Sequence, residues 1–207
     1  FPFFERDKIF NIHLNVPSMQ AKEAYINRYM KRMTEDSLNI ETPEGKKDFI
    51  RNLVATNIVM EGIWFYSGFM VVLSFRQRNQ LRNFGSMVDL VLRDESLHLK
   101  FGIQLLQTVL EENSELLTEE FANEIKSIIV EGVNIETAYN KDLFPNGILG
   151  LNADYVNQYV QYVADRRLLE LGLPKQYGVT NPAKWMSTAT DVLELVNFFE
   201  QQNTKYE

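Results

Sequence analysis

The feature of this sequence that most constrains its fold is a long apolar stretch between residues 53 and 75. Glu61 is its only charged residue, and Arg51 and Arg76 lie just outside its ends. The stretch is long enough to cross a bilayer, which takes about 20 residues, but a carboxylate at mid-depth in lipid is costly. A helix that is apolar on all sides also suits the centre of a large helical bundle. The pattern therefore favours a buried bundle helix, with a membrane span as the alternative.

Helix signals recur along the rest of the chain. Thr118 and Asn152 stand where an N-cap is needed before periodic apolar residues, and Ser18 can serve the same role. Pro43 follows Thr42 at a first helical position, where its missing N–H costs nothing. No hairpin signal joins alternating segments, so we expect an all-α fold. The expected helices cover residues 18–33, 42–78, 85–112, 118–143, 152–172 and 188–200.

Composition narrows the range of functions. The chain has no cysteine, which excludes a disulfide scaffold and thiolate metal ligands. It carries 28 acidic and 21 basic side chains, and the net charge of −7 argues against nucleic-acid binding. The histidines are His13 and His98, so imidazole chemistry must use one of these or another chain. No secretion signal is visible, and we expect a cytoplasmic protein that does not enter a membrane.

A seam along the expected helix 85–112 combines apolar residues with Glu95 and His98. Positions spaced alternately by three and four residues share one helix face, which we expect to point into a core. A carboxylate and an imidazole one turn apart in an apolar core carry a desolvation cost that metal coordination removes. A buried, hydrogen-bonded Glu–His pair is the alternative. The seam consists of Val88, Val91, Glu95, His98, Gly102, Leu105 and Val109.

Glu61 strengthens the metal interpretation. It lies midway along the neighbouring core helix, as Glu95 and His98 do along theirs. A lone Glu on one helix and a Glu-x-x-His on the next make half of a ferritin-like dinuclear carboxylate site. This sequence offers no second half, because Phe10 rather than Glu stands three residues before His13. We therefore expect missing or separately encoded sequence to complete the site.

Segments 61–69 (EGIWFYSGF) and 93–98 (RDESLH) resemble the two central helices of the small, radical-generating subunit of class I ribonucleotide reductase. The resemblance runs from about residue 51 to the C-terminus and implies a ferritin-like helical bundle. Residues 1–207 would then form a single helical domain, the C-terminal part of a larger bundle. We expect an upstream segment to precede Phe1 and to cover the aromatic rings there. The alternative is that the sequence simply starts at Phe1 and no such segment packs on them. Further matching segments are 148–152 (ILGLN), 162–166 (YVADR), 169–172 (LELG) and 197–200 (NFFE).

The resemblance also implies a ligand set. The family binds its metals with an Asp or Glu, a Glu-x-x-His, a second Glu and a second Glu-x-x-His. Glu61, Glu95 and His98 match the last three of these ligands. The implied cofactor is a dinuclear metal centre, with two irons first and Mn/Fe or Mn/Mn as alternatives. The implied partners are the N-terminal half of the small subunit, a second copy in a two-fold homodimer, and a large catalytic subunit.

The resemblance assigns roles to residues that touch no metal. Asp94, with Arg93 beside it, matches a carboxylate that links a metal-ligating His of the absent half to a Trp on the radical-transfer route. Phe65 and Phe69 match apolar residues around the oxidised Tyr. Tyr206 stands where the family has a tail Tyr that hands the radical to the large subunit. A solvated charge, core packing and a plain terminal residue are the respective alternatives.

Taken together, the residues and the resemblance predict the small subunit (beta) of a ribonucleoside-diphosphate reductase. Such a subunit houses a dinuclear metal and radical cofactor, which initiates reduction of ribonucleotides to deoxyribonucleotides in the large subunit. Another ferritin-like dinuclear oxidase is one alternative. A metal-free assembly fragment of a divided small subunit is the other.

Overall fold

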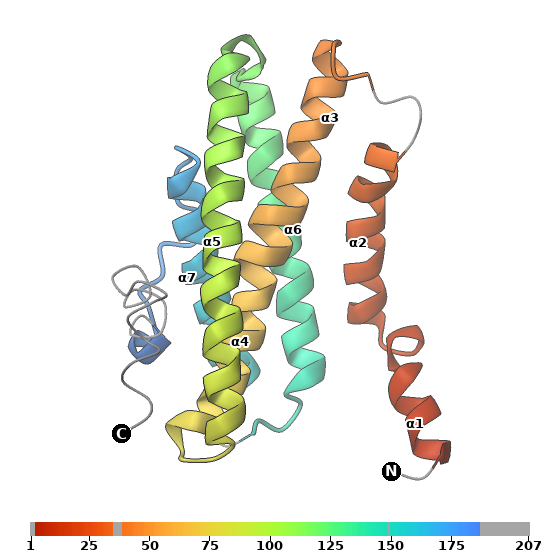
Figure 1. Ribbon diagram of the computed structural model, residues 1–207, viewed down its shortest axis with the longest axis vertical. Coiled ribbons are helices and arrows are strands. Elements are labelled where there is room, and N and C mark those ends of the chain that lie inside the picture. The colour runs from red at the N-terminus through yellow and green to blue at the C-terminus, as the bar shows by residue number, and fades with distance from the viewer. Residues whose placement is uncertain (1–2, 35–38, 149, 187–207) are drawn as a thin grey trace.

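The computed structural model describes residues 3–34, 39–148 and 150–186 (Figure 1). The regular elements in these ranges are helices, and the β contact found there is a single bridge between Ile148 and Leu151. The expectation of an all-α fold is confirmed. The elements are α1 (Phe3–Phe10), the 3₁₀ turn η1 (Ile12–Leu14), α2 (Pro17–Thr34), α3 (Pro43–Leu53), the π-helical segment η2 (Val54–Trp64), α4 (Phe65–Gln77), α5 (Arg82–Glu112), the 3₁₀ turn η3 (Ser114–Leu116), α6 (Glu119–Leu143) and α7 (Ala153–Glu170).

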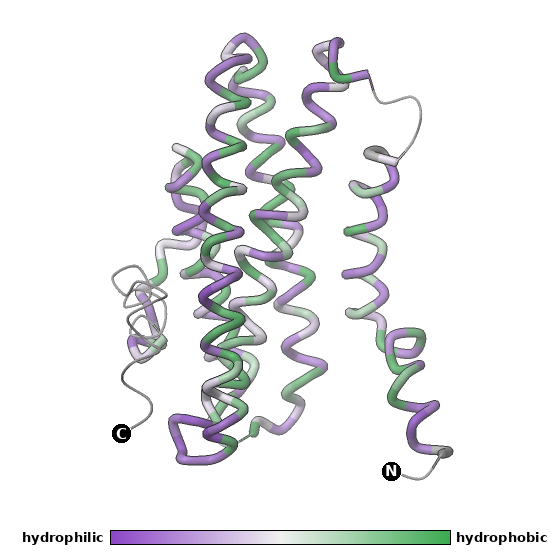
Figure 2. The backbone as a smooth tube through the Cα atoms, viewed as in Figure 1, coloured by the Kyte–Doolittle hydropathy of each residue, from purple (hydrophilic) through white to green (hydrophobic). Residues whose placement is uncertain are grey.

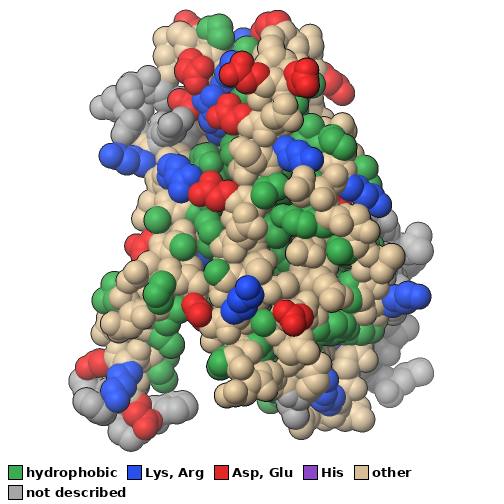
Figure 3. All heavy atoms as spheres, turned by 180° about the vertical axis from the view of Figure 1, so that it is seen from behind, with side chains coloured by type: hydrophobic (Ala, Val, Ile, Leu, Met, Phe, Trp, Pro, Cys, Tyr) green, Lys and Arg blue, Asp and Glu red, His purple; other side chains and the backbone are tan. Residues whose placement is uncertain are grey.

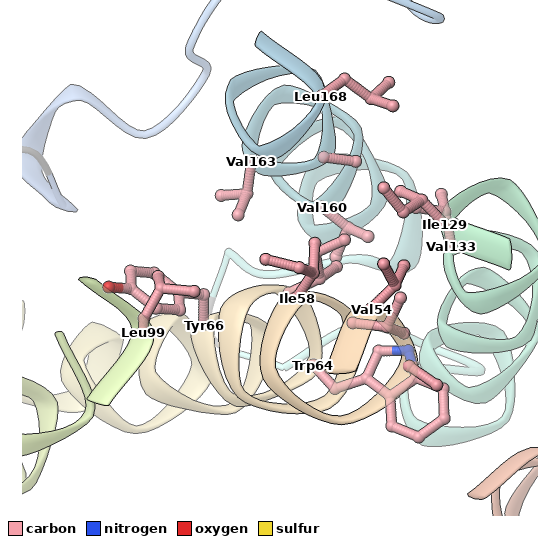
Figure 4. Close-up of a cluster of buried hydrophobic side chains, with 14 of the residues drawn as sticks. Val54, Ile58, Trp64, Tyr66, Leu99, Ile129, Val133, Val160, Val163 and Leu168 are labelled. Carbon is pink, nitrogen blue, oxygen red and sulfur yellow. The ribbon is translucent and has the colours of Figure 1, made fainter. Parts of the chain in front are cut away.

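The apolar stretch forms the centre of the bundle. α3, η2 and α4 make one unbroken helix from Pro43 to Gln77. This helix is long and apolar enough to cross a membrane, but 61% of its most apolar window is buried inside the protein. Figure 4 shows Val54 and Ile58 of η2 facing side chains of α6 and α7. The structure therefore accounts for the apolar stretch as the core helix of a bundle.

The remaining long helices lie around this central helix. α5 folds back beside α4 and packs against α4 and η2, whereas α6 contacts η2, α2 and α7 (Figure 1). Apolar and polar residues alternate along most of these helices (Figure 2), as expected for helices with one face in a core. α2 covers α6 on the side away from α7, and the hydroxyl of its buried Tyr25 donates to the Ile128 carbonyl at 3.0 Å.

Local sequence signals set the N-terminal ends of α3, α6 and α7. The side chains of Thr42, Thr118 and Asn152 accept hydrogen bonds from backbone N–H groups three residues later, at 3.1, 3.2 and 2.8 Å. The prediction that Ser18 is an N-cap is wrong, because Pro17 takes the first helical position and places Ser18 inside α2. The expected helix 188–200 lies outside the described residues.

Ion pairs hold the end of the bundle where α3 and α6 begin. The buried guanidinium of Arg51 contacts Glu44 at 2.6 Å, Asp48 at 2.8 Å and Glu124 of α6 at 2.7 Å. Figure 3 shows acidic and basic side chains mixed over this end of the molecule. The pairs tie α3 to α6 a few turns before Glu61, so they fix the helix that carries the central carboxylate.

Candidate metal centre

Glu61 lies in the π-helical segment at the middle of the central helix. Its Oε2 is buried and has no hydrogen-bond partner among the described residues. Burial raises the pKa of the Glu61 carboxyl, Glu95 raises it further, and His98 opposes both effects. A buried carboxylate oxygen without a donor is costly. The three expected ligands therefore share one electrostatic neighbourhood, in which a positive charge would relieve the cost of burying Glu61.

Glu95 and His98 meet on α5. The Nδ1 atom of His98 lies 3.6 Å from Oε2 of Glu95, too far for a good hydrogen bond but close enough for both to reach one ion. The Glu95 side chain is 17% exposed, whereas that of His98 is 66% exposed. In residues 3–34, 39–148 and 150–186, no three His, Asp or Glu side chains form a group that could hold a metal ion. The three candidate residues thus lie in one region, but within the described residues they do not form a closed site.

The expectation that the whole seam of α5 faces a core is wrong for Val91 and His98, which are exposed. The most buried side chains of α5 are Leu92, Leu99 and Leu106, each one residue further along the helix. One residue turns a helix by about 100°. α5 packs on α3, η2 and α4, so its buried stripe follows those neighbours and leaves Val91 and His98 at the edge.

Glycines bring η2 and α5, the helices that carry the candidate residues, close together, a feature that the sequence patterns did not predict. A Cβ on Gly102 would lie 2.5–2.9 Å from three atoms of the Asn57 side chain, and a Cβ on Gly62 would lie 2.9 Å from Leu99. Asn57 is one turn before Glu61, so its contact with Gly102 sets the spacing beside the ligands. Glycine inside an otherwise strong helix pattern was the available signal.

Exposed apolar side chains lie on α5 and at Phe65, near the three candidate residues. Phe65, one turn after Glu61, is exposed, and its ring makes an edge contact with the buried Phe69 at 6.4 Å between centroids. Large exposed patches of this kind mark sites of association. The apolar side chains of α5 that lie exposed in the described structure are Phe84, Met87, Leu90, Val91, Leu97 and Phe101.

The residues expected to serve radical transfer are only partly placed. Asp94 is exposed on α5, turned away from Glu95 as their adjacent positions require. Arg93, the residue before Asp94, is half-buried. Tyr206 lies outside the described residues. The structure therefore leaves the roles of Asp94 and Tyr206 as predictions.

Comparison with known proteins identifies relatives over nearly the whole sequence. The family model "Ribonucleotide reductase, small chain" matches residues 3–182. The protein is 39% identical over 203 residues to the ribonucleoside-diphosphate reductase subunit beta of Chlamydia pneumoniae, with 98% of this protein and 59% of that one covered. It is 32% identical over 203 residues to the ribonucleoside-diphosphate reductase small chain of Schizosaccharomyces pombe, with 98% and 46% covered. The sequence thus spans about half the length of these relatives.

Solved structures agree in fold. The ribonucleotide reductase R2 subunit from Clostridium botulinum superposes with a TM-score of 0.80 at 24% identity, with 92% of this protein and 58% of that one covered. The Rnr4 homodimer of Saccharomyces cerevisiae gives a TM-score of 0.66 at 23% identity, with 95% and 52% covered. These likenesses support the ferritin-like helical fold. Because the family model covers most of the sequence and the relatives align along almost all of it, the chain belongs to the ribonucleotide reductase small-chain family.

Proposed function

We propose that this chain is the C-terminal part of a ribonucleotide reductase small subunit and supplies half of its dinuclear metal site. Glu61, Glu95 and His98 are the proposed ligands. The observation that carries the proposal is the buried, unpartnered Oε2 of Glu61, whose pKa responds to Glu95 and His98. Carboxylate and imidazole donors suit iron and manganese, with two irons as the first choice.

The donor set fits a metal ion because each group offers what coordination needs. Glu61 and Glu95 provide carboxylate oxygens, and His98 provides a neutral imidazole nitrogen. The open apolar face of α5 and the exposed ring of Phe65 need a cover, and sequence that carries the remaining ligands would supply both cover and donors. When bound, the dinuclear centre would activate O₂ and store one oxidising equivalent.

Residues of this protein would then protect the oxidised group from water and pass the oxidising equivalent on. Phe65 and Phe69 would exclude water from the oxidised group once the face is covered. Asp94 and Tyr206 would pass the equivalent to a large catalytic subunit, where ribonucleotides are reduced. The assembly would contain the N-terminal half of the small subunit and two-fold related copies, since symmetric dimers are the commonest oligomers.

A test of the ligand assignment measures metal in the complex of this chain with the polypeptide that supplies the other ligands. Glu61→Ala, Glu95→Ala and His98→Ala should each lower bound iron at least tenfold, because loss of a residue that only supports a ligand already costs about 10–100-fold in metal affinity. Glu111→Ala, an exposed glutamate further along α5, is the matched control and should keep full iron. Full iron in His98→Ala would refute the assignment. Full iron in all three variants would favour a protein that serves assembly alone.

A further inference from the structure

Arg167 of α7 reaches the backbone beside Glu61. Its guanidinium is buried, and its Nε donates to the carbonyl oxygen of Gly62 at 3.0 Å. Gly62 is the residue after Glu61. A Cβ at position 62 would come within 3.2 Å of Arg167 Nε and 2.9 Å of Leu99. A glycine at this position therefore lets α7 hold the ligand-bearing segment by its main chain.

The contact falls where the helix changes its hydrogen-bonding pattern. The N–H of Phe65 still bonds to the carbonyl of Met60, five residues back, and the α-helix α4 starts at Phe65. A return from five-residue to four-residue spacing skips one carbonyl of the junction, and π-helical turns of this kind recur at functional sites. Because Phe65 bonds to Met60, the carbonyl passed over is that of Glu61, and Arg167 donates to the next carbonyl, that of Gly62. Its hydrogen bond therefore anchors the end of the π-helical segment, one residue after Glu61, to α7.

Arg167 is also connected to α5, the helix that carries Glu95, through the side chain of Tyr66. Its guanidinium carbon lies 5.1 Å from the centre of the Tyr66 ring, and the Tyr66 hydroxyl lies 3.1 Å from Ser96 Oγ. Ser96 already donates its proton to the Leu92 carbonyl at 2.7 Å, so Tyr66 is the donor. Ser96 follows Glu95 directly. Figure 4 shows Tyr66 and Leu99 side by side where α4 meets α5.

The contacts of Arg167 connect it to the backbone after Glu61 rather than to the charge of the Glu61 carboxylate. Glu170 faces its Nη1 at 2.9 and 2.7 Å, which offsets the positive charge. The shift in the pKa of Glu61 has burial, Glu95 and His98 as its causes. Lysine could not replace the guanidinium, because its single ammonium lacks the planar fork that reaches Gly62 and Glu170 together.

We propose that Arg167 is a positioning residue for the metal centre. It fixes the π-helical segment that carries Glu61 and, through Tyr66 and Ser96, the register of that segment against Glu95. The part of the proposal that concerns metal rests on the proposed function. The part that concerns the backbone does not, so the two can fail separately.

Amide hydrogen exchange of the protein without metal tests the backbone part. Arg167→Met keeps the length and apolar stem of the side chain, and it should speed exchange at residues 61–66 at least tenfold while residues 125–133 of α6 stay unchanged. Arg167→Lys should not restore the slow exchange. Arg82→Met, an exposed arginine on α5, is the control. Unchanged exchange at residues 61–66, or an equal rise in α6, overturns the proposal.

A milder variant covers the case in which Arg167→Met does not fold. Tyr66→Phe removes one hydroxyl, and faster exchange at residues 92–99 is expected because Ser96 loses its donor. Unchanged exchange there overturns the register step. In the iron-loaded complex, both variants should shift the optical bands of the centre without lowering its iron content. Wild-type protein that takes up no iron refutes the proposed function alone, whereas unshifted bands in loaded variants refute the positioning role alone.

Discussion

Two carboxylates of the bundle, the buried Glu136 of α6 and the partly buried Glu61 of η2, differ in whether the protein itself supplies a cation. Burial raises the pKa of both carboxyls. Glu136 is 1% exposed, and Lys22 of α2 meets its Oε2 at 2.5 Å. The Lys22 ammonium also lies over the rings of Trp64 at 4.7 Å and Tyr139 at 4.1 Å. This acid is compensated within the protein itself.

Glu61 has the opposite surroundings. A second acid, Glu95, raises its pKa further, and in the described part of the sequence no lysine or arginine pairs with its buried Oε2, in contrast to the Lys22 pair at Glu136. The open face of α5 lies beside it, whereas α2 covers Glu136. The difference teaches that the cost of an unpaired carboxylate oxygen inside a bundle is relieved when a cation meets it. Lys22 provides that cation at one site, and a metal would provide it at the other.

The largest effect expected from this comparison comes from removing the Lys22 cation beside Glu136. Lys22→Met should lower the free energy of unfolding by about 3 kcal/mol, because it leaves the buried Glu136 without its cation. Denaturant titration of the full protein measures the loss. The double variant Lys22→Met with Glu136→Gln should recover most of it, since no unpaired charge remains. A loss below about 1 kcal/mol, typical of a surface pair, would mean that Glu136 is not isolated from water.

A smaller loss of stability should follow from pushing α5 away from η2. Gly102→Ala places a methyl group against Asn57 and should cost about 1–3 kcal/mol, the usual range for overpacking. Gly68→Ala on α4 is the matched control, because a Cβ there meets nothing within 4 Å. It should stabilise the protein by about 0.5–1 kcal/mol through the helix preference of alanine. Thermal unfolding that moves in the same direction for both variants would contradict the close approach of α5 to η2.

The comparison also separates what the sequence could predict from what it could not. The caps at Thr118 and Asn152 were predictable because they depend on side chains three residues from their partners. The pairing of Arg167 with Gly62 was not, because 105 residues separate them. The sequence predicted that Glu61 lies near Glu95 and His98 because these residues stand midway along neighbouring helices, and the influence of Glu95 and His98 on the pKa of Glu61 agrees with that neighbourhood.

The orientation of α5 was beyond a periodicity argument. Leu92 and Leu99, rather than Val91 and His98, are buried, because the neighbours of a helix decide which of two adjacent stripes turns inward. The π-helical form of η2 also carried no signal in its residue pattern. Both features depend on packing between segments distant in sequence, and both bear directly on the candidate site.

The smallest effect concerns the pH dependence of stability. The folded-state pKa of Glu61 lies above its ordinary value of 4.5, so between these two values the folded protein binds more protons than the unfolded protein. Stability from this group is full below pH 4.5 and is lost as the pH rises through the folded-state pKa. Glu61→Gln removes the titration, so the variant should unfold less readily than the wild type near pH 7, by less than about 1 kcal/mol. Unfolding curves from about pH 4 to about pH 8 measure the difference, which should vanish at the acid end.

Iron should reverse the sign of that difference. With the other ligands present, the Glu61 carboxylate would face a cation, as Glu136 faces Lys22. Wild-type protein in the loaded complex should then be more stable than Glu61→Gln, because binding to the folded state adds stability that the variant cannot gain. If the variant is more stable with and without iron, Glu61 is merely an uncompensated acid, and the parallel between the two carboxylates fails.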